Sequence, residues 1–380
     1  MSINNKVKCG SDRFDIIEKR IKGKRCGLLT AASGVDSEGV PTYFKLHQLG
    51  TLSVLFAPEH GIHSVMQDGG WEGGHIDAET GIPVYDLPAK GNPAIGEALS
   101  LCDIVLYDIQ DVGARFYTYI YCLTYLMQEC AFRNIPIVIL DRPNPISGCL
   151  SSISGAILDE SRFSSFVGKY AIPTRYSLTC GEFAKYINSV KKIGCDLTVV
   201  ECAGWERGMY ADETGLLWIN PSPNIPTVNC AINYIGTCLI EATNVSEGRG
   251  TTRPFDLVGA PFIDSAKLCD EMNSYELEGI HFSRAFFTPM FGKWKGSVCE
   301  GVQFNIYDRL RYNPHSAGVH LIASLQKYKE FECNKNSMCL RYGLDSLTAQ
   351  DMIDPKVILD SELEGIEKFK TSISEYLIYD

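Results

Sequence analysis

The sequence lacks an excess of basic residues: 35 lysines and arginines stand against 46 aspartates and glutamates, which gives a formal net charge of −11. Proteins that bind duplex nucleic acid need a basic face to release counterions from the phosphates, so we do not expect nucleic acid as a partner. The chain also lacks any apolar run of about eighteen residues, the length that a membrane-spanning helix requires. No apolar segment follows the first six residues, so we expect no secretory signal either.

Cysteine pairs of the CxxC type are missing as well. The fifteen cysteines are scattered between Cys9 and Cys339, and their number is odd. A secreted protein with so many unmatched thiols would risk mispairing, whereas a reducing compartment keeps each one as a small buried hydrophobe. The sequence therefore predicts a cytoplasmic protein.

Several catalytic signatures are also absent. The chain contains no HExxH helix motif, no GxxxxGK[ST] phosphate loop and no GxSxG nucleophile elbow, which argues against a zinc protease of that type, a P-loop nucleotidase and a serine hydrolase of the α/β-hydrolase type. Gly248 and Gly250 form a GxG pair, but no predicted strand precedes them as a dinucleotide fold requires. We therefore predict no cofactor and no bound metal.

The first half of the chain does contain the pattern of an α/β fold. Short apolar runs bounded by turn residues alternate with helical stretches, as expected for strands that are buried on both faces of a parallel sheet. The predicted strands are residues 26–30, 52–57, 104–107, 135–140 and 197–200. The predicted helices between and after them are residues 42–49, 116–133 and 180–191.

The length predicts a second domain. A single hydrophobic core rarely grows beyond about 250–300 residues, and this chain has 380. Three prolines between Asn220 and Thr227 make that segment stiff and extended. We place the boundary there and predict a Rossmann-like N-terminal catalytic domain, residues 1–228, followed by a smaller α+β domain, residues 229–380, that closes a cleft.

Charged residues follow three of the predicted strands at the point where each strand ends. In an open parallel sheet, ligands bind beyond the carboxyl ends of the strands, so such residues are candidates for a site. The second strand is followed by Glu59 and His60, the third by Asp108, Asp111 and Arg115, and the fourth by Arg142 and Asn144.

Glu59 is the sharpest candidate among them. It comes directly after a buried strand and a proline, which predicts a carboxyl group at the floor of a cleft. Partial burial favours the protonated form of a carboxyl group in general, and that form suits a general acid. We interpret the neighbouring His60 as a hydrogen-bonded active-site residue. The alternative is a metal site built from His60, His63 and Asp68, although their spacing matches no established zinc pattern.

A further cluster lies between Glu241 and Phe255, where Glu247 and Arg249 stand close to two glycines. Glycine lets the backbone approach a ligand closely. An arginine in this segment either binds a substrate carboxylate in a bidentate manner or pairs with Glu247. Aromatic residues such as Tyr117 and Trp218 are possible stacking partners for sugar rings, although aromatic side chains more often belong to the core.

The motifs together resemble one family, the NamZ family of exo-β-N-acetylmuramidases. The resemblance runs in order from about Gly27 to beyond Cys299. It is carried by LLTAASGVD at 28–36, LFAPEHG at 55–61, TGIPV at 80–84, DIQDVGARFYTY at 108–119, LDRPNPI at 140–146, SFVG at 165–168, GWER at 204–207, WINPSPNIPT at 218–227 and TNVSEGRGTT at 243–252.

The resemblance implies a Rossmann-like domain, a smaller C-terminal domain and a cleft between the two. It also implies an enzyme that releases N-acetylmuramic acid from the non-reducing end of peptidoglycan fragments. The glutamate of the family's PEHG motif falls on Glu59, which makes Glu59 the expected catalytic carboxylate. The arginine of its GRGT motif falls on Arg249. Within the matched motifs we expect Tyr117, Asn144 and Asn224 to contact the sugar.

Glycoside cleavage needs a proton for the leaving oxygen and a second group that stabilises the developing positive charge. We assign the proton to Glu59. The second role is open to Asp108, Asp111 or Glu247, or to the acetamido oxygen of the substrate itself. The lactyl carboxylate of muramic acid requires a cationic partner, for which the sequence offers Arg115, Arg142 and Arg249.

Two rival interpretations remain at this stage. The first is a metal-dependent hydrolase that uses His60, His63 and Asp68. The second is a non-catalytic protein that binds muropeptides and leaves them intact. The sequence carries no signal for an oligomeric state.

Overall fold

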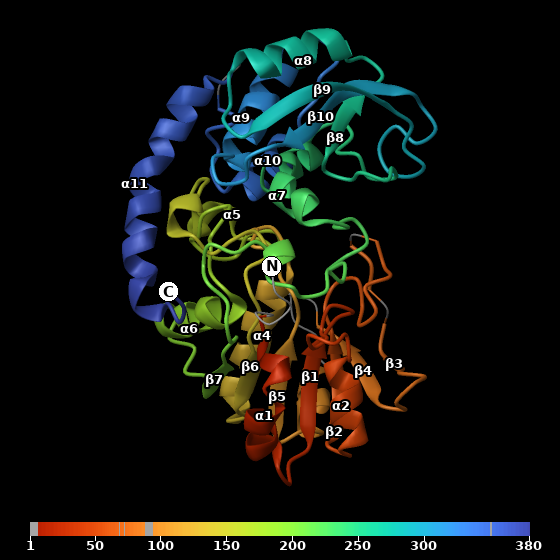
Figure 1. Ribbon diagram of the computed structural model, residues 1–380, viewed down its shortest axis with the longest axis vertical. Coiled ribbons are helices and arrows are strands. Elements are labelled where there is room, and N and C mark those ends of the chain that lie inside the picture. The colour runs from red at the N-terminus through yellow and green to blue at the C-terminus, as the bar shows by residue number, and fades with distance from the viewer. Residues whose placement is uncertain (1–6, 68, 72, 88–93, 350–351) are drawn as a thin grey trace.

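The computed structural model describes residues 7–67, 69–71, 73–87, 94–349 and 352–380. Figure 1 shows two stacked parts: a sheet with helices on both faces, and above it a smaller group of strands and helices. Residues up to about 227 form the lower part, and most of the remaining chain forms the upper part. The two parts share one continuous hydrophobic cluster that reaches from Leu29 to Ile373.

The lower part is built on a sheet of seven strands in the order β3-β4-β2-β1-β5-β6-β7. All neighbouring strands run parallel except β3 and β4. The chain moves from the central β1 to one side and then returns to the other side, which is the doubly wound arrangement. The strands are β1 Cys26–Thr30, β2 Leu52–Ala57, β3 His75–Ile76, β4 Pro83–Asp86, β5 Ile104–Asp108, β6 Ile137–Leu140 and β7 Leu197–Val200.

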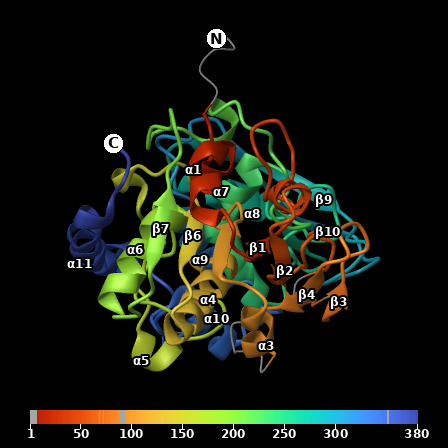
Figure 2. The ribbon, with the colours of Figure 1, turned by 90° about the horizontal axis from the view of Figure 1, so that it is seen from below.

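Helices cover both faces of this sheet, as Figure 2 shows with α1 on one side of the strands and α3 and α4 on the other. Every residue of β1, β5 and β6 is buried, which explains why these strands are mainly apolar rather than alternating, with polar Thr30 and Asp108 only at the strand ends. One face packs under α1 (Phe14–Ile21) and α2 (Thr42–Gln48). The other packs against α3 (Ile95–Ser100), α4 (Tyr119–Arg133) and α6 (Cys180–Val190).

The upper part contains a second, antiparallel sheet in the order β8-β10-β9. Its strands are β8 Leu257–Ala260, β9 Ile280–Phe287 and β10 Cys299–Ile306. The helices around it are α7 Val228–Thr237, the 3-10 helix η4 Cys238–Ala242, α8 Ser265–Ser274, α9 Pro314–Leu325 and α10 Lys335–Tyr342. The short α5, Glu160–Phe163, belongs to the lower part.

The last helix, α11 (Pro355–Ile373), returns the chain from the upper part to the lower part, along the left side of Figure 1. The tail after it is bound to the sheet domain. The backbone N–H of Ile378 donates to Glu182 Oε1 at 2.8 Å, and the Tyr379 hydroxyl donates to Asp141 Oδ2 at 2.7 Å. The C-terminal end therefore ties the two parts together.

The predicted fold class is confirmed: a Rossmann-like parallel sheet is followed by a smaller α+β unit. The predicted strands at 26–30, 52–57 and 197–200 have the expected bounds. The predicted helix at 116–133 begins three residues later, at Tyr119, and residues 116–118 line a cavity before it. In the part of the chain that the structure describes, no helix has both the length and the apolar character to cross a bilayer.

Candidate active site

A cavity of about 190 Å³ lies between the two parts of the molecule. The lower part contributes the loop after β2, the residues before α4 and the 222–225 segment. The upper part contributes α7, η4, the segment before β8 and the end of α10. The described residues that line the cavity are Glu59, His60, Gly69, Phe116, Tyr117, Thr118, Phe166, Val167, Ser222, Asn224, Ile225, Tyr234, Cys238, Glu241, Arg249, Phe255 and Arg341.

Glu59 lies on the sheet-domain wall of this cavity and is 8% exposed. The backbone N–H of Gly69 donates to Oε1 at 2.7 Å, and the Thr118 hydroxyl donates to Oε2 at 2.8 Å. Thr118 is the residue before α4, where a threonine hydroxyl usually caps its own helix, but it makes no such cap here. A hydroxyl both donates and accepts, so Thr118 can hold either protonation state of the carboxyl group.

His60 also lines the cavity, and its backbone has a φ of +74°, which is uncommon for a residue other than glycine. Two backbone hydrogen bonds hold this turn, from His60 N–H to Gly70 O and from Met66 N–H to His60 O. Its ring Nδ1 lies 2.7 Å from the Met66 carbonyl oxygen. Because a carbonyl only accepts, the proton belongs on Nδ1, and Nε2 is left as an acceptor when the ring is neutral.

The loop that follows Glu59 reaches the opposite rim of the cavity. The side chain of Asn224 donates from Nδ2 to Gln67 Oε1 at 3.0 Å. Gly69, which binds Glu59, has a φ of +74°. The loop that follows the PEHG segment is therefore joined directly to the proline-rich 220–227 segment.

Aromatic rings form the inner surface of the cavity. Tyr117 packs edge-on against Tyr119 and Tyr234, at centroid distances of 4.8 and 6.2 Å. Tyr234 also contacts Phe116 at 5.1 Å and Phe255 at 4.6 Å. Sugar rings present apolar faces, so a surface of this kind suits a saccharide.

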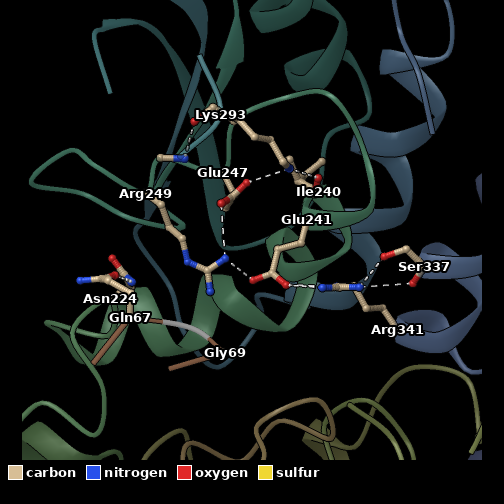
Figure 3. A network of polar contacts seen from close by, with 12 residues as sticks. Gln67, Gly69, Asn224, Ile240, Glu241, Glu247, Arg249, Lys293, Ser337 and Arg341 are labelled. Atoms are coloured by element: carbon tan, nitrogen blue, oxygen red, sulfur yellow. Dashed lines mark hydrogen bonds and ion pairs between the residues drawn. The ribbon is translucent and has the colours of Figure 1, made fainter. Parts of the chain in front are cut away.

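The upper part contributes a charged network to the site (Figure 3). Glu241 accepts from two arginines: Arg249 Nη1 lies 2.5 Å from Oε1, and Arg341 Nη2 lies 2.7 Å from Oε2. Glu247 pairs with Lys293 at 3.0 Å and with Arg249 at 3.4 Å. The Arg249 guanidinium also stacks over the ring of Phe255, 4.9 Å from its centroid.

Glu241 stays ionised in this setting. Burial alone would raise its pKa, but the charges of Arg249 and Arg341 outweigh burial and hold the pKa below its ordinary value. Glu241 is therefore the negative centre that keeps two arginines at the cavity wall.

The structure places Asp108 and Arg142, two of the predicted site residues, outside this cavity. These residues lie at the end of β5 and after β6, where a doubly wound sheet usually opens to ligands, but they bind each other. Arg142 Nε donates to Asp108 Oδ1 at 2.6 Å, and the Thr42 hydroxyl donates to Oδ2 at 2.6 Å. Asp108 is fully buried, and neither residue lines the cavity. Arg142 instead lines a second, smaller pocket together with Ser33 and Gln110.

Asp111 and Asn144 also lie outside the cavity, in contrast to their expected roles. Asp111 is buried and accepts hydrogen bonds from the Gly113 backbone, at 2.7 Å, and from the Tyr176 hydroxyl. Asn144 donates to the Leu178 carbonyl at 3.0 Å. Burial raises the pKa of Asp111 to about 6, and the Tyr176 hydrogen bond opposes that shift. Both side chains hold the loops that follow β5 and β6.

Arg115 does not face the cavity either, because its side chain is fully buried. Nη1 donates to the carbonyl of Ile172 at 2.9 Å and to that of Ala156. Nη2 donates to the carbonyls of Arg341 and Tyr342 at 2.8 and 2.6 Å. Arg115 therefore joins the lower part to the end of α10 in the upper part, and of the three candidate carboxylate partners only Arg249 lines the cavity.

The metal interpretation finds no supporting geometry among the described residues, which contain no group of three His, Cys, Asp or Glu side chains that could hold an ion. His63 lies 3.7 Å from Asp77, and no third His, Cys, Asp or Glu side chain among the described residues completes a metal site with them. Asp68, the proposed third ligand, lies outside the described residues. Trp218 lines a different, open pocket.

Three residues at the cavity were missed from the sequence: Thr118, Glu241 and Arg341. Thr118 lies inside the 108–119 motif, and its polar side chain just before a predicted helix was the available signal. Glu241 lies two residues before the 243–252 motif, where a carboxylate next to a glycine-rich segment was the available signal. Arg341 follows no strand and belongs to no motif. Only folding brings it to Glu241, 100 positions earlier in the chain.

Comparison with known proteins gives matches along almost the whole chain. The family model described as exo-β-N-acetylmuramidase NamZ, N-terminal, matches residues 26–229, and the model for the C-terminal domain matches residues 232–379. The chain is 40% identical to the peptidoglycan β-N-acetylmuramidase NamZ of Bacillus subtilis (strain 168), over 98% of this chain and 92% of that protein.

Two crystal structures have the same fold. Both are DUF1343 family proteins of Bacteroides fragilis. One superposes with a TM-score of 0.88 and 29% identity, covering 99% of this chain and 100% of the other. The second has a TM-score of 0.78 and 28% identity, covering 98% and 99%.

Proposed function

The chain belongs to the NamZ family of exo-β-N-acetylmuramidases, and from this we propose that it releases N-acetylmuramic acid from the non-reducing end of peptidoglycan fragments, with Glu59 as the proton donor. The observation that carries the assignment of Glu59 is its place in the cavity. It is the carboxyl group on the sheet-domain wall, held at both oxygens and shielded from water.

In the proposed reaction, the Glu59 proton passes to the glycosidic oxygen while the bond from that oxygen to the anomeric carbon breaks. The acetamido oxygen of the same sugar forms the new bond to the anomeric carbon. This bond closes a ring between the acetamido group and the anomeric carbon. Water then attacks the anomeric carbon and opens that ring, and the Glu59 carboxylate takes up the proton that water loses. No residue needs to supply a nucleophile in this scheme.

The arrangement of the other carboxylates supports the substrate-assisted course. Asp108, Asp111 and Glu247, which the sequence offered as the second group, do not line the cavity. Glu241 does line it, but both of its oxygens bind arginines. Among the described residues, these contacts leave the substrate's own acetamido group as the partner of Glu59. Arg249 remains as the partner of the lactyl carboxylate, and Tyr117 and Asn224 as contacts for the sugar.

The test is incubation with the disaccharide of N-acetylmuramic acid and N-acetylglucosamine, followed by mass spectrometry of the products. We expect both monosaccharides from the wild type. Glu59→Gln keeps both hydrogen bonds, since the amide oxygen accepts from Gly69 and the amide nitrogen donates to Thr118. We expect it to fold normally and to lose about 10²–10⁴-fold in kcat, the usual contribution of a general acid.

The matched control is Glu278→Gln, an exposed glutamate outside the cavity, which should keep full activity. A Glu59→Gln enzyme that cleaves the disaccharide at the wild-type rate would exclude Glu59 as the acid. Binding of the intact disaccharide by the wild type, without any products, would instead support a non-catalytic muropeptide-binding protein.

We also propose that the protein works in the cytoplasm. All fifteen cysteines are free thiols, and thirteen of them are buried, which fits a reducing compartment. Cell fractionation against a cytoplasmic marker enzyme tests this: recovery of the protein outside the cells would contradict it.

A further inference from the structure

The imidazole of His60 has one ring nitrogen in use and one available. Nδ1 donates to the Met66 carbonyl oxygen at 2.7 Å, so in the neutral ring Nε2 carries a lone pair and only accepts. Within the described part of the chain no donor binds Nε2, and this atom is not enclosed by other protein atoms. Because the His60 side chain lines the cavity, Nε2 is an acceptor that is open to a ligand there.

An uncommon backbone conformation places this ring beside the proton donor. His60 follows Glu59 directly and has a φ of +74°, in the left-handed region that residues other than glycine, asparagine and aspartate rarely adopt. Successive side chains in extended backbone point to opposite sides, whereas Glu59 and His60 both line the cavity. A strained residue persists only where its surroundings hold it, and such residues gather at functional sites.

One loop holds both side chains. The Met66 N–H donates to the His60 carbonyl at 3.2 Å, so residues 60 and 66 are joined by this bond and by the Nδ1 bond. Three residues later, the Gly69 N–H donates to Glu59 Oε1 at 2.7 Å. The imidazole also packs edge-on against Tyr119, with ring centroids 6.4 Å apart. These contacts fix the tautomer and the orientation of the ring, which is 7% exposed.

We propose that His60 Nε2 accepts a hydrogen bond from the N–H of the substrate's 2-acetamido group. The proposal rests on the proposed function, because it names the side chain that binds the acetamido group while its oxygen attacks the anomeric carbon. In that step the amide nitrogen shares its lone pair with the carbonyl carbon, and positive charge develops on nitrogen. The N–H becomes a stronger donor, so its hydrogen bond to Nε2 strengthens in the transition state. The proton stays on the nitrogen throughout.

His60 suits this contact better than the other acceptors of the cavity. The acetamido nitrogen is bonded to the carbon next to the anomeric carbon, so its partner must lie close to the proton donor, and His60 is the neighbour of Glu59. Glu241 also accepts, but both of its oxygens bind arginines. Asn224 lies in a different segment, where its amide donates to Gln67. An atom that only accepts favours a substrate that donates at this position.

The experiment compares two aryl glycosides of muramic acid, one with the natural 2-acetamido group and one with a 2-acetoxy group. The ester keeps the carbonyl oxygen that attacks the anomeric carbon, but it replaces the N–H by an oxygen that cannot donate. For each enzyme, the ratio of kcat on the acetamido substrate to kcat on the acetoxy substrate measures the contribution of the N–H contact.

His60→Asn removes Nε2 and preserves the loop. Asparagine tolerates the left-handed backbone, and its amide nitrogen is a donor for the Met66 carbonyl in place of Nδ1. We expect the ratio to fall about 10- to 100-fold, the range for loss of a hydrogen bond to a charged group. The loss should appear in kcat on the acetamido substrate with little change in KM, because the contact strengthens in the transition state. The acetoxy substrate should be cleaved at least as fast as by the wild type.

His60→Gln carries an amide oxygen near the position of Nε2 and should regain part of the ratio. His281→Asn, at an exposed histidine of β9 outside the cavity, is the matched control and should keep the wild-type ratio. An unchanged ratio in folded His60→Asn would overturn the proposal. An equal loss on both substrates would overturn it too, because His60 would then only shape the loop. Failure of the proposed function has a different result: the wild type cleaves neither glycoside, or Glu59→Gln cleaves the disaccharide at the wild-type rate.

Discussion

Replacement of Arg115 by methionine separates the structural role seen here from the substrate-binding role that the sequence predicted. Methionine has nearly the length of the arginine stem but no charge and no donor. In the wild type, the guanidinium donates to four carbonyl groups, two in each part of the molecule. In Arg115→Met all four carbonyls lose the guanidinium as a donor, and the Ile172 carbonyl keeps the backbone N–H of Leu158 at 3.4 Å.

The expected cost follows from the burial of Arg115, which is fully withdrawn from water. Removal of one partner from a buried charged contact costs about 3–5 kcal/mol, because the groups left behind are unsatisfied. Burying the charge itself is unfavourable, which keeps the net loss below the sum of four separate bonds. With about 2.1 cal/mol/K of unfolding entropy per residue, a chain of 380 residues should lose roughly 4–6 °C in Tm.

Thermal unfolding followed by circular dichroism measures this shift, with Lys169→Met as a control that removes a half-buried cation elsewhere. We expect the variant to keep, in part, its preference for a muramic acid glycoside with a free lactyl carboxylate over one with a neutral carboxamide, because Arg249 still lines the cavity. An unchanged Tm together with complete loss of that preference would refute this reasoning and return Arg115 to the role of a direct carboxylate partner.

Two further predictions follow from the contacts of single residues. Thr118→Val removes the hydroxyl that donates to Glu59 and should lower kcat about tenfold or more with little change in KM. Thr118→Ser keeps a hydroxyl and should retain the wild-type rate. Equal rates in the wild type and both variants would contradict a positioning role for Thr118. The pKa of the Asp111 carboxyl is raised by burial to about 6 in the folded protein, so its contribution to stability is present below pH 4 and is lost as the pH rises through 6. Asp111→Asn does not titrate and so does not lose this stability. The free energy of unfolding of the variant minus that of the wild type should therefore rise by about 3 kcal/mol from pH 4 to pH 7. Urea unfolding of both proteins across this range measures the difference, and parallel pH profiles would contradict the prediction.

The fold class was predictable from the sequence because it depends on local patterns. Strands buried on both faces are mainly apolar, and the runs at 26–30 and 52–57 each contain only one hydroxyl residue. The position of Glu59 followed from the same rule, because a residue directly after a parallel strand and a proline lies at the edge of the sheet where sites form. Arg249 was accessible in a similar way, from its two neighbouring glycines.

The distribution of charges among partners was decided by the tertiary structure alone. Sequence reasoning treated Arg115, Arg142 and Arg249 as equivalent, because each is an arginine within two residues of a glycine or a proline. Folding buries Arg142 against Asp108 and turns Arg115 onto carbonyl groups that lie 226 and 227 positions later in the chain. The arginine beside Arg249 at the cavity is instead Arg341. Which ion pairs form depends on which chain segments fold against each other. The local sequence does not contain this information when the segments are distant in the chain.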